Sequence, residues 1–262
     1  MKPPPVRRET VRLDHGPVAL ARVGSGEPVV LLHQTPRSVD EYRDVLPLLA
    51  QRGFHAVAFE TPGFGESAPL PGEPTIERWA AALHAAMDEV GLHRTAIVGH
   101  HTGGVIAVEL AYQRPERVAA LVLSSTPLTD AGYRATPPDE SGVDTGDDAE
   151  SLRHSRAGFY PADRAELLDR YVADALRAGP LARQGHHIVG SYEMDEKLTR
   201  LNMPVLLIGA DSDPFAFPQL ERMMAALPSA RTTVIRGGMV PLPDGWPHEF
   251  GHAVANFLIS LR

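Results

Sequence analysis

Hydrophobic residues along the chain gather in short β-branched runs that alternate with longer segments in which apolar residues recur every three or four positions. The short runs predict strands, and the longer periodic segments predict amphipathic helices. Their regular alternation predicts a mainly parallel sheet covered by helices, because a parallel crossover needs a connecting helix. The expected strands are residues 10–15, 18–24, 28–33, 55–60, 95–100, 118–125, 204–210 and 231–237.

Local sequence signals predict a hairpin and one helix more precisely. The first two strands are separated only by residues 16–17, Gly-Pro, which predicts an antiparallel hairpin at one edge of the sheet. A helix is expected after the fourth strand, where Ile76, Leu83 and Met87 fall on one face and Gly91 follows as the stop.

The alternation breaks between residues 129 and 200. A polar stretch rich in proline and glycine leads there into three helix-like segments, and strand pattern resumes only at Pro204. We therefore expect a helical cap at residues 129–200, inserted into a core domain made of residues 1–128 and 201–262. The entry loop of this cap, residues 137–148, is polar and is expected to be the first site of proteolysis.

Composition narrows the possible partners and chemistry. The chain has 262 residues, enough for one full core with an insertion, and its formal net charge of -8 gives no electrostatic reason to bind nucleic acid or acidic membranes. It contains no cysteine, which excludes disulfides, thiolate metal sites and a cysteine nucleophile. No apolar run approaches the ~20 residues of a membrane span, so a cytoplasmic protein is expected. Nothing in the sequence indicates an oligomeric state.

One short stretch carries the candidate chemistry. The sequence VGHHTGG at residues 98–104 follows an apolar run and precedes a helix-like segment. Its outline is that of a G-x-S-x-G elbow, the strand-to-helix turn that presents a serine nucleophile, with His101 at the serine position. Gly99 and Gly103 keep the glycine positions of the turn. The hydroxyl of Thr102 does not replace the serine, because the residue after the nucleophile mainly supplies its backbone N–H.

Five motifs in order along the chain support a family resemblance. They are HQTP at 33–36, similar to an H-G-x-P oxyanion loop; ETPGFGES at 60–67, similar to a D-x-P-G-x-G-x-S turn; the elbow at 98–104; ADSDP at 210–214, similar to an acid turn; and GGMV at 237–240, at the place of a G-G-H loop. In this order they resemble the α/β-hydrolase superfamily over nearly the whole chain. The resemblance implies an α/β-hydrolase fold with a mostly parallel eight-stranded sheet, flanking helices and an inserted helical cap.

The same resemblance shows that a serine triad is incomplete. Such a triad needs a hydroxyl to attack, an imidazole to take its proton and a carboxylate to orient the imidazole. Asp213 fits the acid position, with Asp211 as the nearby alternative, but Met239 stands where the histidine belongs. A thioether does not exchange protons, so Met239 leaves open a pocket position that an imidazole otherwise fills. We expect His101 to reach Asp213 directly or through one water and to act as the catalytic base.

The oxyanion hole depends on backbone N–H groups and so survives the loss of triad side chains. The resemblance assigns these donors to Gln34 and Thr102. His33, His100 and Glu60 are interpreted as structural. A metal site built from His101 and the histidines of the expected cap lacks a recognisable ligand spacing, so neither a metal nor another cofactor is expected.

Three functions fit these residues. The first is cofactor-independent acid–base chemistry of the lyase or isomerase type on a small carbonyl compound, with His101 as base and the backbone donors stabilising an oxyanion or enolate. The second is hydrolysis of an ester, lactone or β-diketone, with His101 activating water or attacking as a nucleophile. The third is a non-catalytic protein that binds a small ligand in the same pocket.

Overall fold

The eight expected strands form one sheet in the computed structural model, which describes residues 5–135 and 148–262. The strands are β1 (Arg7–Leu13), β2 (Gly16–Val23), β3 (Glu27–Leu32), β4 (Phe54–Phe59), β5 (Thr95–His100), β6 (Val118–Ser124), β7 (Val205–Ala210) and β8 (Arg231–Ile235). Their order is β1-β2-β4-β3-β5-β6-β7-β8, with β2 antiparallel to both neighbours and all other pairs parallel. The prediction of a mostly parallel eight-stranded sheet is confirmed.

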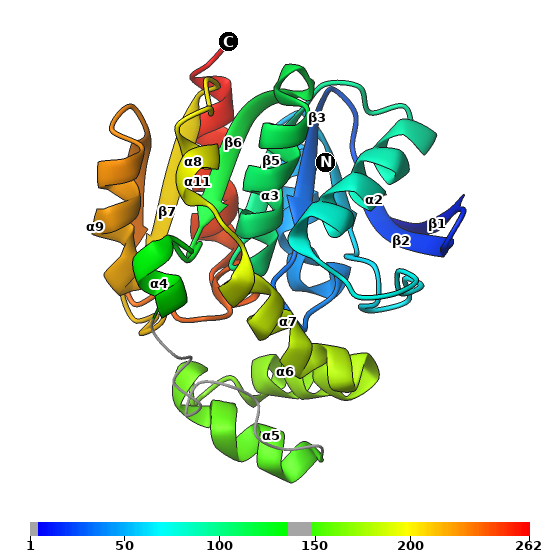
Figure 1. Ribbon diagram of the computed structural model, residues 1–262, viewed down its shortest axis with the longest axis vertical. Coiled ribbons are helices and arrows are strands. Elements are labelled where there is room, and N and C mark those ends of the chain that lie inside the picture. The colour runs from blue at the N-terminus through cyan, green and yellow to red at the C-terminus, as the bar shows by residue number, and fades with distance from the viewer. Residues whose placement is uncertain (1–4, 136–147) are drawn as a thin grey trace.

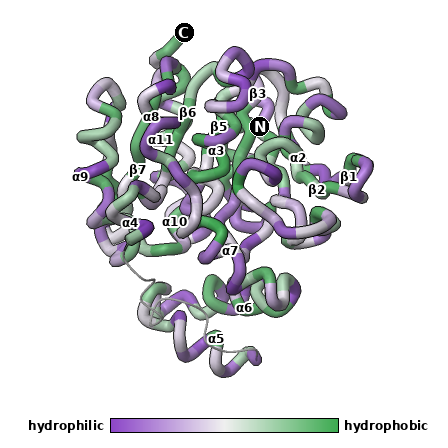
Figure 2. Tube along the Cα trace, in the orientation of Figure 1, coloured by the Kyte–Doolittle hydropathy of each residue, from purple (hydrophilic) through white to green (hydrophobic). Residues whose placement is uncertain are grey.

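Helices cover both faces of this sheet (Figure 1). One layer contains α2 (Ile76–Glu89), α3 (Thr102–Gln113) and α9 (Phe217–Ala226), and the other contains α1 (Val45–Gln51), α10 (Leu242–Gly245) and α11 (Pro247–Ile259). In β3, Val30 and Leu32 pack into the first layer, whereas Val29 and Leu31 pack into the second. This alternation follows from the two-residue period of a strand and explains why the central strands are apolar along most of their length, as Figure 2 shows.

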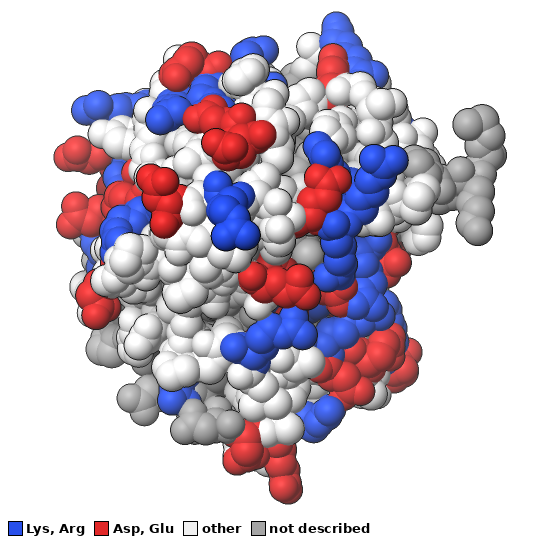
Figure 3. Space-filling model, turned by 90° about the vertical axis from the view of Figure 1, so that its right-hand side faces the viewer, with Lys and Arg blue, Asp and Glu red and all other residues white. Residues whose placement is uncertain are grey.

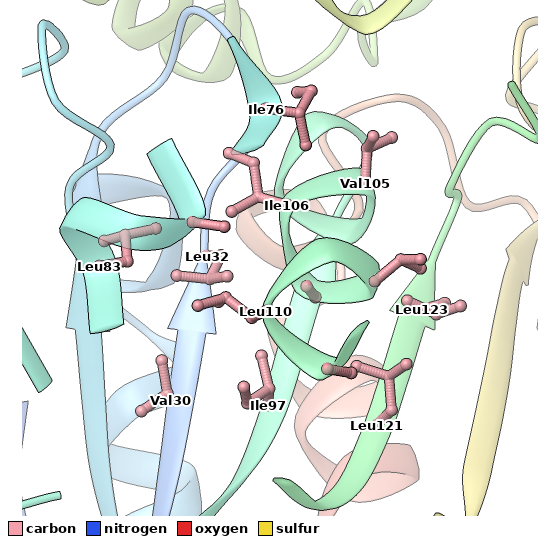
Figure 4. Packing of buried hydrophobic residues seen from close by; sticks show 14 of the residues in the cluster. Val30, Leu32, Ile76, Leu83, Ile97, Val105, Ile106, Leu110, Leu121 and Leu123 are labelled. Carbon is pink, nitrogen blue, oxygen red and sulfur yellow. The ribbon is translucent and has the colours of Figure 1, made fainter. Parts of the chain in front are cut away.

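Helix α3 is the most enclosed helix of the first layer. Its residues from Thr102 to Ala111 are all buried, because the helix lies between the sheet and α2. Figure 4 shows Val105, Ile106 and Leu110 of α3 packed among Leu32, Ile97 and Leu121 of the sheet and Leu83 of α2. Close packing on all sides fixes the start of α3, which is the end that carries the elbow.

The segment between β6 and β7 contributes only helices to the described structure. They are α4 (Ala131–Ala135), α5 (Ala149–Arg156), the 3-10 helix η4 (Ala157–Phe159), α6 (Ala165–Ala178), α7 (Pro180–Ser191) and α8 (Asp195–Leu198). Figure 1 shows α5 and α6 beyond one end of the sheet, and their buried residues form an apolar cluster of their own that includes Leu152, Leu167 and Tyr171. The division into a cap at 129–200 and a core domain stays a prediction, and residues 137–147 of its expected entry loop lie outside the described residues.

A buried ion network connects α6 to the sheet domain. The guanidinium of Arg37, which is fully buried in the loop after β3, donates from Nε to Asp174 of α6 at 2.9 Å. Its two terminal nitrogens donate to Oδ2 of Asp244 in α10 at 3.1 and 3.2 Å. Arg170 of α6 also pairs with Asp244, and Ser38 donates to Asp174. Three segments far apart in sequence are therefore held by one charge cluster.

The outer surface is strongly charged but mixed in sign. Figure 3 shows acidic and basic side chains next to one another on the side of the molecule that carries β1, β2 and α2. Two ion pairs involve the edge strands: Arg8 pairs with Asp40, and Arg22 pairs with Glu9. In the part of the chain that the structure describes, no helix is both long and apolar enough to cross a membrane.

Candidate active site

The elbow lies between the end of β5 and the start of α3. His101 joins the two elements with φ 46° and ψ -115°, a positive φ that is strained for a residue with a side chain. Its N–H donates to the carbonyl of Ser124 in the neighbouring strand at 2.9 Å, and its carbonyl accepts from the N–H groups of Gly104 and Val105. These bonds hold the strained residue at the carboxyl end of the sheet.

Two glycines make this turn possible because other backbone atoms lie against them. A Cβ at Gly99 would come within 2.2 Å of the Gly103 carbonyl oxygen, and a Cβ at Gly103 within 2.0 Å of the Leu32 carbonyl oxygen. Real Cβ atoms do not approach backbone so closely. A side chain at Gly99 would push α3 away from β5, and one at Gly103 would push α3 away from β3; either shift would move residue 101.

The structure brings His101 and Asp213 together in one contact. Nε2 of His101 lies 2.7 Å from Oδ2 of Asp213, whose carboxylate is fully buried in the loop after β7. The other oxygen, Oδ1, accepts the N–H groups of Phe215 and Ala216, both at 3.0 Å. Burial raises the pKa of the Asp213 carboxyl, but His101 and these N–H donors outweigh burial and hold the pKa below its ordinary value. Asp213 is therefore an ionised hydrogen-bond acceptor.

This contact sets the tautomer of the imidazole. An ionised carboxylate only accepts, so Nε2 of His101 carries the hydrogen that lies between the two groups. In the neutral ring the lone pair is then on Nδ1, which makes no hydrogen bond to any residue in the described part of the chain. The side chain of His101 is 15% exposed, which makes it the accessible member of the pair.

Asp211, the alternative acid, has a different partner. Its Oδ1 accepts the N–H of Gly237 at 2.6 Å, and the carbonyl of Gly238 accepts the N–H of Ser212 at 2.9 Å. These bonds tie the loop after β8 to the loop that carries Asp213. Met239 lies half-buried in that tied loop, and its proposed place in the pocket stays a prediction.

One of the two expected oxyanion donors is engaged elsewhere. The Gln34 N–H donates to Oε2 of Glu41 at 2.9 Å, and the Gln34 side-chain amide donates to Oε1 of Glu41 at 2.7 Å. The prediction of a free Gln34 N–H is therefore wrong for this structure, because a side chain at position 34 lets one carboxylate take both donors. Within residues 5–135 and 148–262, the N–H groups of Thr35 and Thr102 have no protein acceptor. Thr102 remains a candidate donor, and the Thr35 N–H is a second candidate because it too lacks a protein acceptor among the described residues.

Glu41 itself is fully buried beneath the oxyanion loop. Burial raises the pKa of its carboxyl to about 7, although Arg37 and the two bonds from Gln34 oppose the rise. Sequence reasoning missed this residue because its partner is seven positions away and the 3-10 helix that contains it, η1 (Val39–Tyr42), has no motif. The available signal was the replacement of a loop glycine by Gln34, whose amide needs a partner when buried.

The two buried histidines next to the site are held neutral. His100 contacts the Val240 carbonyl through Nε2 at 2.9 Å and the Ser124 hydroxyl through Nδ1 at 3.1 Å, and burial lowers its pKa to about 3. His33 contacts the Gln34 carbonyl through Nδ1 and accepts the Thr61 N–H through Nε2, and burial lowers its pKa to about 4. Both rings use both nitrogens to join loops, which supports their interpretation as structural.

Glu60 likewise has local partners. Its Oε2 accepts the N–H of Glu66 at 2.6 Å and the Ser67 hydroxyl at 3.4 Å, so the carboxylate closes the turn that follows β4. Burial raises the pKa of the Glu60 carboxyl. A Cβ at Gly65 would collide with this side chain, which explains the glycine in the turn.

Comparison with known proteins identifies the family. Residues 27–238 match the family model described as alpha/beta hydrolase fold. The bifunctional epoxide hydrolase 2 of Sus scrofa is 29% identical over 185 residues, which are 67% of this chain and 33% of that protein. The chain spans less than half the length of the first curated relatives that it matches.

Solved structures agree with the fold. The bromoperoxidase from Bacillus anthracis superposes with a TM-score of 0.81 at 22% identity, covering 97% of this chain and 100% of that one. A thermophilic esterase from Thermogutta terrifontis superposes with a TM-score of 0.78 at 23% identity, covering 97% of this chain and 98% of that one. These relatives are enzymes, and this chain has the same fold. The chain therefore belongs to the α/β-hydrolase fold family.

Proposed function

We propose that this protein is a cofactor-independent enzyme that acts on a small carbonyl compound, with His101 as its general base. The observation that carries the proposal is the 2.7 Å contact between Nε2 of His101 and Oδ2 of Asp213. A carboxylate that binds one ring nitrogen orients the imidazole and stabilises the imidazolium that forms when the other nitrogen takes a proton. Nδ1 is that other nitrogen, and it is the proton acceptor in this proposal.

The backbone donors supply the second requirement. A base that removes a proton from a substrate leaves negative charge on the carbonyl oxygen, and two N–H groups fixed in place stabilise that charge. Thr35 lies in the loop after β3 and Thr102 is the first residue of α3, and neither N–H group has an acceptor in the part of the chain that the structure describes. Loss of one such donor costs about 3 to 4 kcal/mol of barrier in other enzymes, so the pair supports catalysis without a serine.

With only one base in the site, the same group must take the proton from the substrate and return it to the product. Nδ1 of His101 takes one proton from the substrate and returns it to the product, as in enolisation, elimination or carbon–carbon cleavage next to a carbonyl. Asp211 binds the loop at Gly237, and Met239 exchanges no proton, so neither provides a second base. Chemistry of the lyase or isomerase type needs only this one group together with the oxyanion donors.

Hydrolysis is the second candidate, and the relatives favour it. Several of them are named as hydrolases, including the pig epoxide hydrolase and the Thermogutta esterase. In this version Nδ1 of His101 takes the proton of a water that attacks the carbonyl carbon of an ester, lactone or β-diketone, and then returns it to the leaving group. The same dyad and the same donors serve both reactions.

Isotope labelling separates the two candidates. The protein is incubated with a panel of simple esters, lactones, β-diketones and β-hydroxy ketones in D2O and, in parallel, in H2-18-O. Deuterium on carbon without an oxygen-18-labelled carboxylate product indicates proton transfer at carbon, whereas oxygen-18 in a carboxylate product indicates hydrolysis; oxygen-18 in an aldehyde or ketone is not counted, because these exchange oxygen with water. Binding without turnover of any member would overturn the enzymatic proposal in favour of a ligand-binding protein.

Substitution of the base tests the assignment of His101. General acid–base groups contribute ~10² to 10⁴ in rate, so His101→Ala should lose turnover in that range and keep most of its ligand affinity. Asp213→Asn should also lower the rate, because an amide no longer stabilises the imidazolium. His93→Ala, at an exposed histidine outside the site, is the matched control and should keep full activity. Full activity in His101→Ala, or an acyl adduct on His101 by intact mass, would contradict a general base.

A further inference from the structure

The outward face of α11 carries two histidines one helical turn apart. The helix contains the sequence HEFGH, in which His248 and His252 are exposed while Phe250 and Val254 are buried against the sheet. Side chains four positions apart on a helix are neighbours on the same face. Both imidazoles therefore project into solvent from one patch of a helix whose other side is fixed by core packing.

The two rings already lie close to each other. Their centroids are 6.4 Å apart and their planes are inclined by 59°. In the described part of the chain neither ring makes a hydrogen bond or an ion pair with another residue. Each imidazole therefore keeps a nitrogen lone pair that no protein group uses, and lone pairs of this kind bind transition metals.

We propose that His248 and His252 together bind one divalent transition-metal ion, such as Ni²⁺, Cu²⁺ or Zn²⁺, on the surface of α11. Imidazole nitrogens lie ~2.0 to 2.1 Å from a bound metal, which places two ring centroids about 5 Å apart on one ion. From 6.4 Å the ring centroids must approach each other by about 1.4 Å. Rotation of two exposed side chains provides this movement without any change in the helix.

The surroundings define what kind of metal site this is. The spacing H-E-x-x-H is that of zinc proteases, in which a third protein ligand completes a site inside a cleft. Here no group of three His, Asp or Glu side chains suited to a metal ion occurs among residues 5–135 and 148–262. Two imidazoles on a convex helix leave the remaining coordination positions to water. The site therefore binds metal without the enclosed pocket of a protease, and Glu249 has no catalytic role there.

Titration of the tag-free protein with NiCl2 by calorimetry, after removal of metal with a chelator, tests the proposal. We expect one Ni²⁺ per chain. Because one helix presents the second imidazole at high local concentration, loss of either ring should weaken binding by about 100-fold. His248→Ala and His252→Ala should each show this loss. Cu²⁺ should bind more tightly than Ni²⁺, following the usual order of affinities for nitrogen ligands.

Three control variants locate the ion. Glu249→Gln should bind Ni²⁺ like the wild type, because the carboxylate is not a ligand, and His93→Ala should do the same because its ring is exposed on another segment. His101→Ala should also be unchanged, which separates this site from the proposed catalytic dyad. Unchanged affinity in both His248→Ala and His252→Ala, loss of binding in Glu249→Gln, or one ion shared by two chains would each overturn the proposal.

Discussion

Replacing Arg37 with methionine removes the cation that joins α6 to the sheet domain. Methionine has a similar length and fills much of the same space, so the change tests charge and hydrogen bonding more than packing. Three hydrogen bonds are lost, one to Asp174 and two to Asp244. Both carboxylates stay buried after the change, and each keeps one donor, Ser38 for Asp174 and Arg170 for Asp244.

The size of the effect follows from these remaining partners. Breaking a buried ion pair by removing one member costs about 3 to 5 kcal/mol, because the other charge is left uncompensated. Since Asp174 and Asp244 each retain a donor, we expect the lower end, about 3 kcal/mol of the free energy of unfolding. For a chain of this size that loss corresponds to a fall in Tm of roughly 6 to 12 °C.

Urea denaturation and hydrogen exchange measure this effect together. The free energy of unfolding should fall by the stated amount, and amides of α6 should exchange faster while those of β5 keep their protection, because the network holds α6 and not the sheet. Arg8→Met is the matched control, since Arg8 pairs with Asp40 at the surface and such pairs contribute at most about 1 kcal/mol.

The two variants give a clear refutation. If Arg37→Met costs no more than Arg8→Met, the buried network does not anchor α6 and the reasoning is wrong. A double-mutant cycle with Asp174→Asn adds a second check, because residues in direct contact should show a loss smaller than the sum of the two single losses.

Three further predictions concern the groups around the site. The pKa values of His33 and His100 are lowered from 6.5 to about 4 and about 3, so the free energy of unfolding should fall as pH drops below 6.5. At pH 5 the expected loss in urea titrations is roughly 2 kcal/mol per histidine. No loss would show that the buried rings are not held neutral. Serine-directed fluorophosphonates should leave the intact mass unchanged, and labelling mapped to Thr102 would show that the elbow has been misread. The pKa of Glu41 is raised to about 7 from an ordinary 4.5, so its contribution to stability is present below pH 4.5 and lost towards pH 7. The free energy of unfolding of the wild type, relative to that of Glu41→Gln, should therefore fall across that interval. A constant difference would contradict the raised pKa.

Much of the fold could be predicted from local pattern. Buried strands are continuous apolar runs, so the expected bounds of β5 agree with the structure at both ends. The expected bounds of the other strands differ from the structure by a few residues. The helix after the fourth strand was expected from its apolar face, and Gly91 follows it with a positive φ of 73°. These features depend on neighbours in sequence, which is the information that a pattern contains.

The parts of the site that could not be predicted depend on contacts across the chain. The two hydrogen bonds from Gln34 to Glu41 form only because the 3-10 helix η1 turns the carboxylate back under the loop. The periodicity of apolar residues does not predict that turn. Arg37 meets Asp174 and Asp244 only because the folded chain brings together positions 137 and 207 residues apart. A motif identifies which loop is present, whereas side chains from other elements decide which of its N–H groups remains free.

The direct contact between His101 and Asp213 also bears on how this site could change by mutation. Under the assignment that the family resemblance implies, serine chemistry in this chain would need a serine at 101 and an imidazole at 239. Serine alone at 101 would have no base to take its proton. Histidine alone at 239 would compete with His101 for Oδ2 of Asp213, because Oδ1 already accepts two backbone N–H groups. With His101 as the base, each intermediate loses the present chemistry before it gains the other. If His101 is the base, single substitutions at 101 or 239 should each lower activity, and only the paired replacement should produce a serine enzyme.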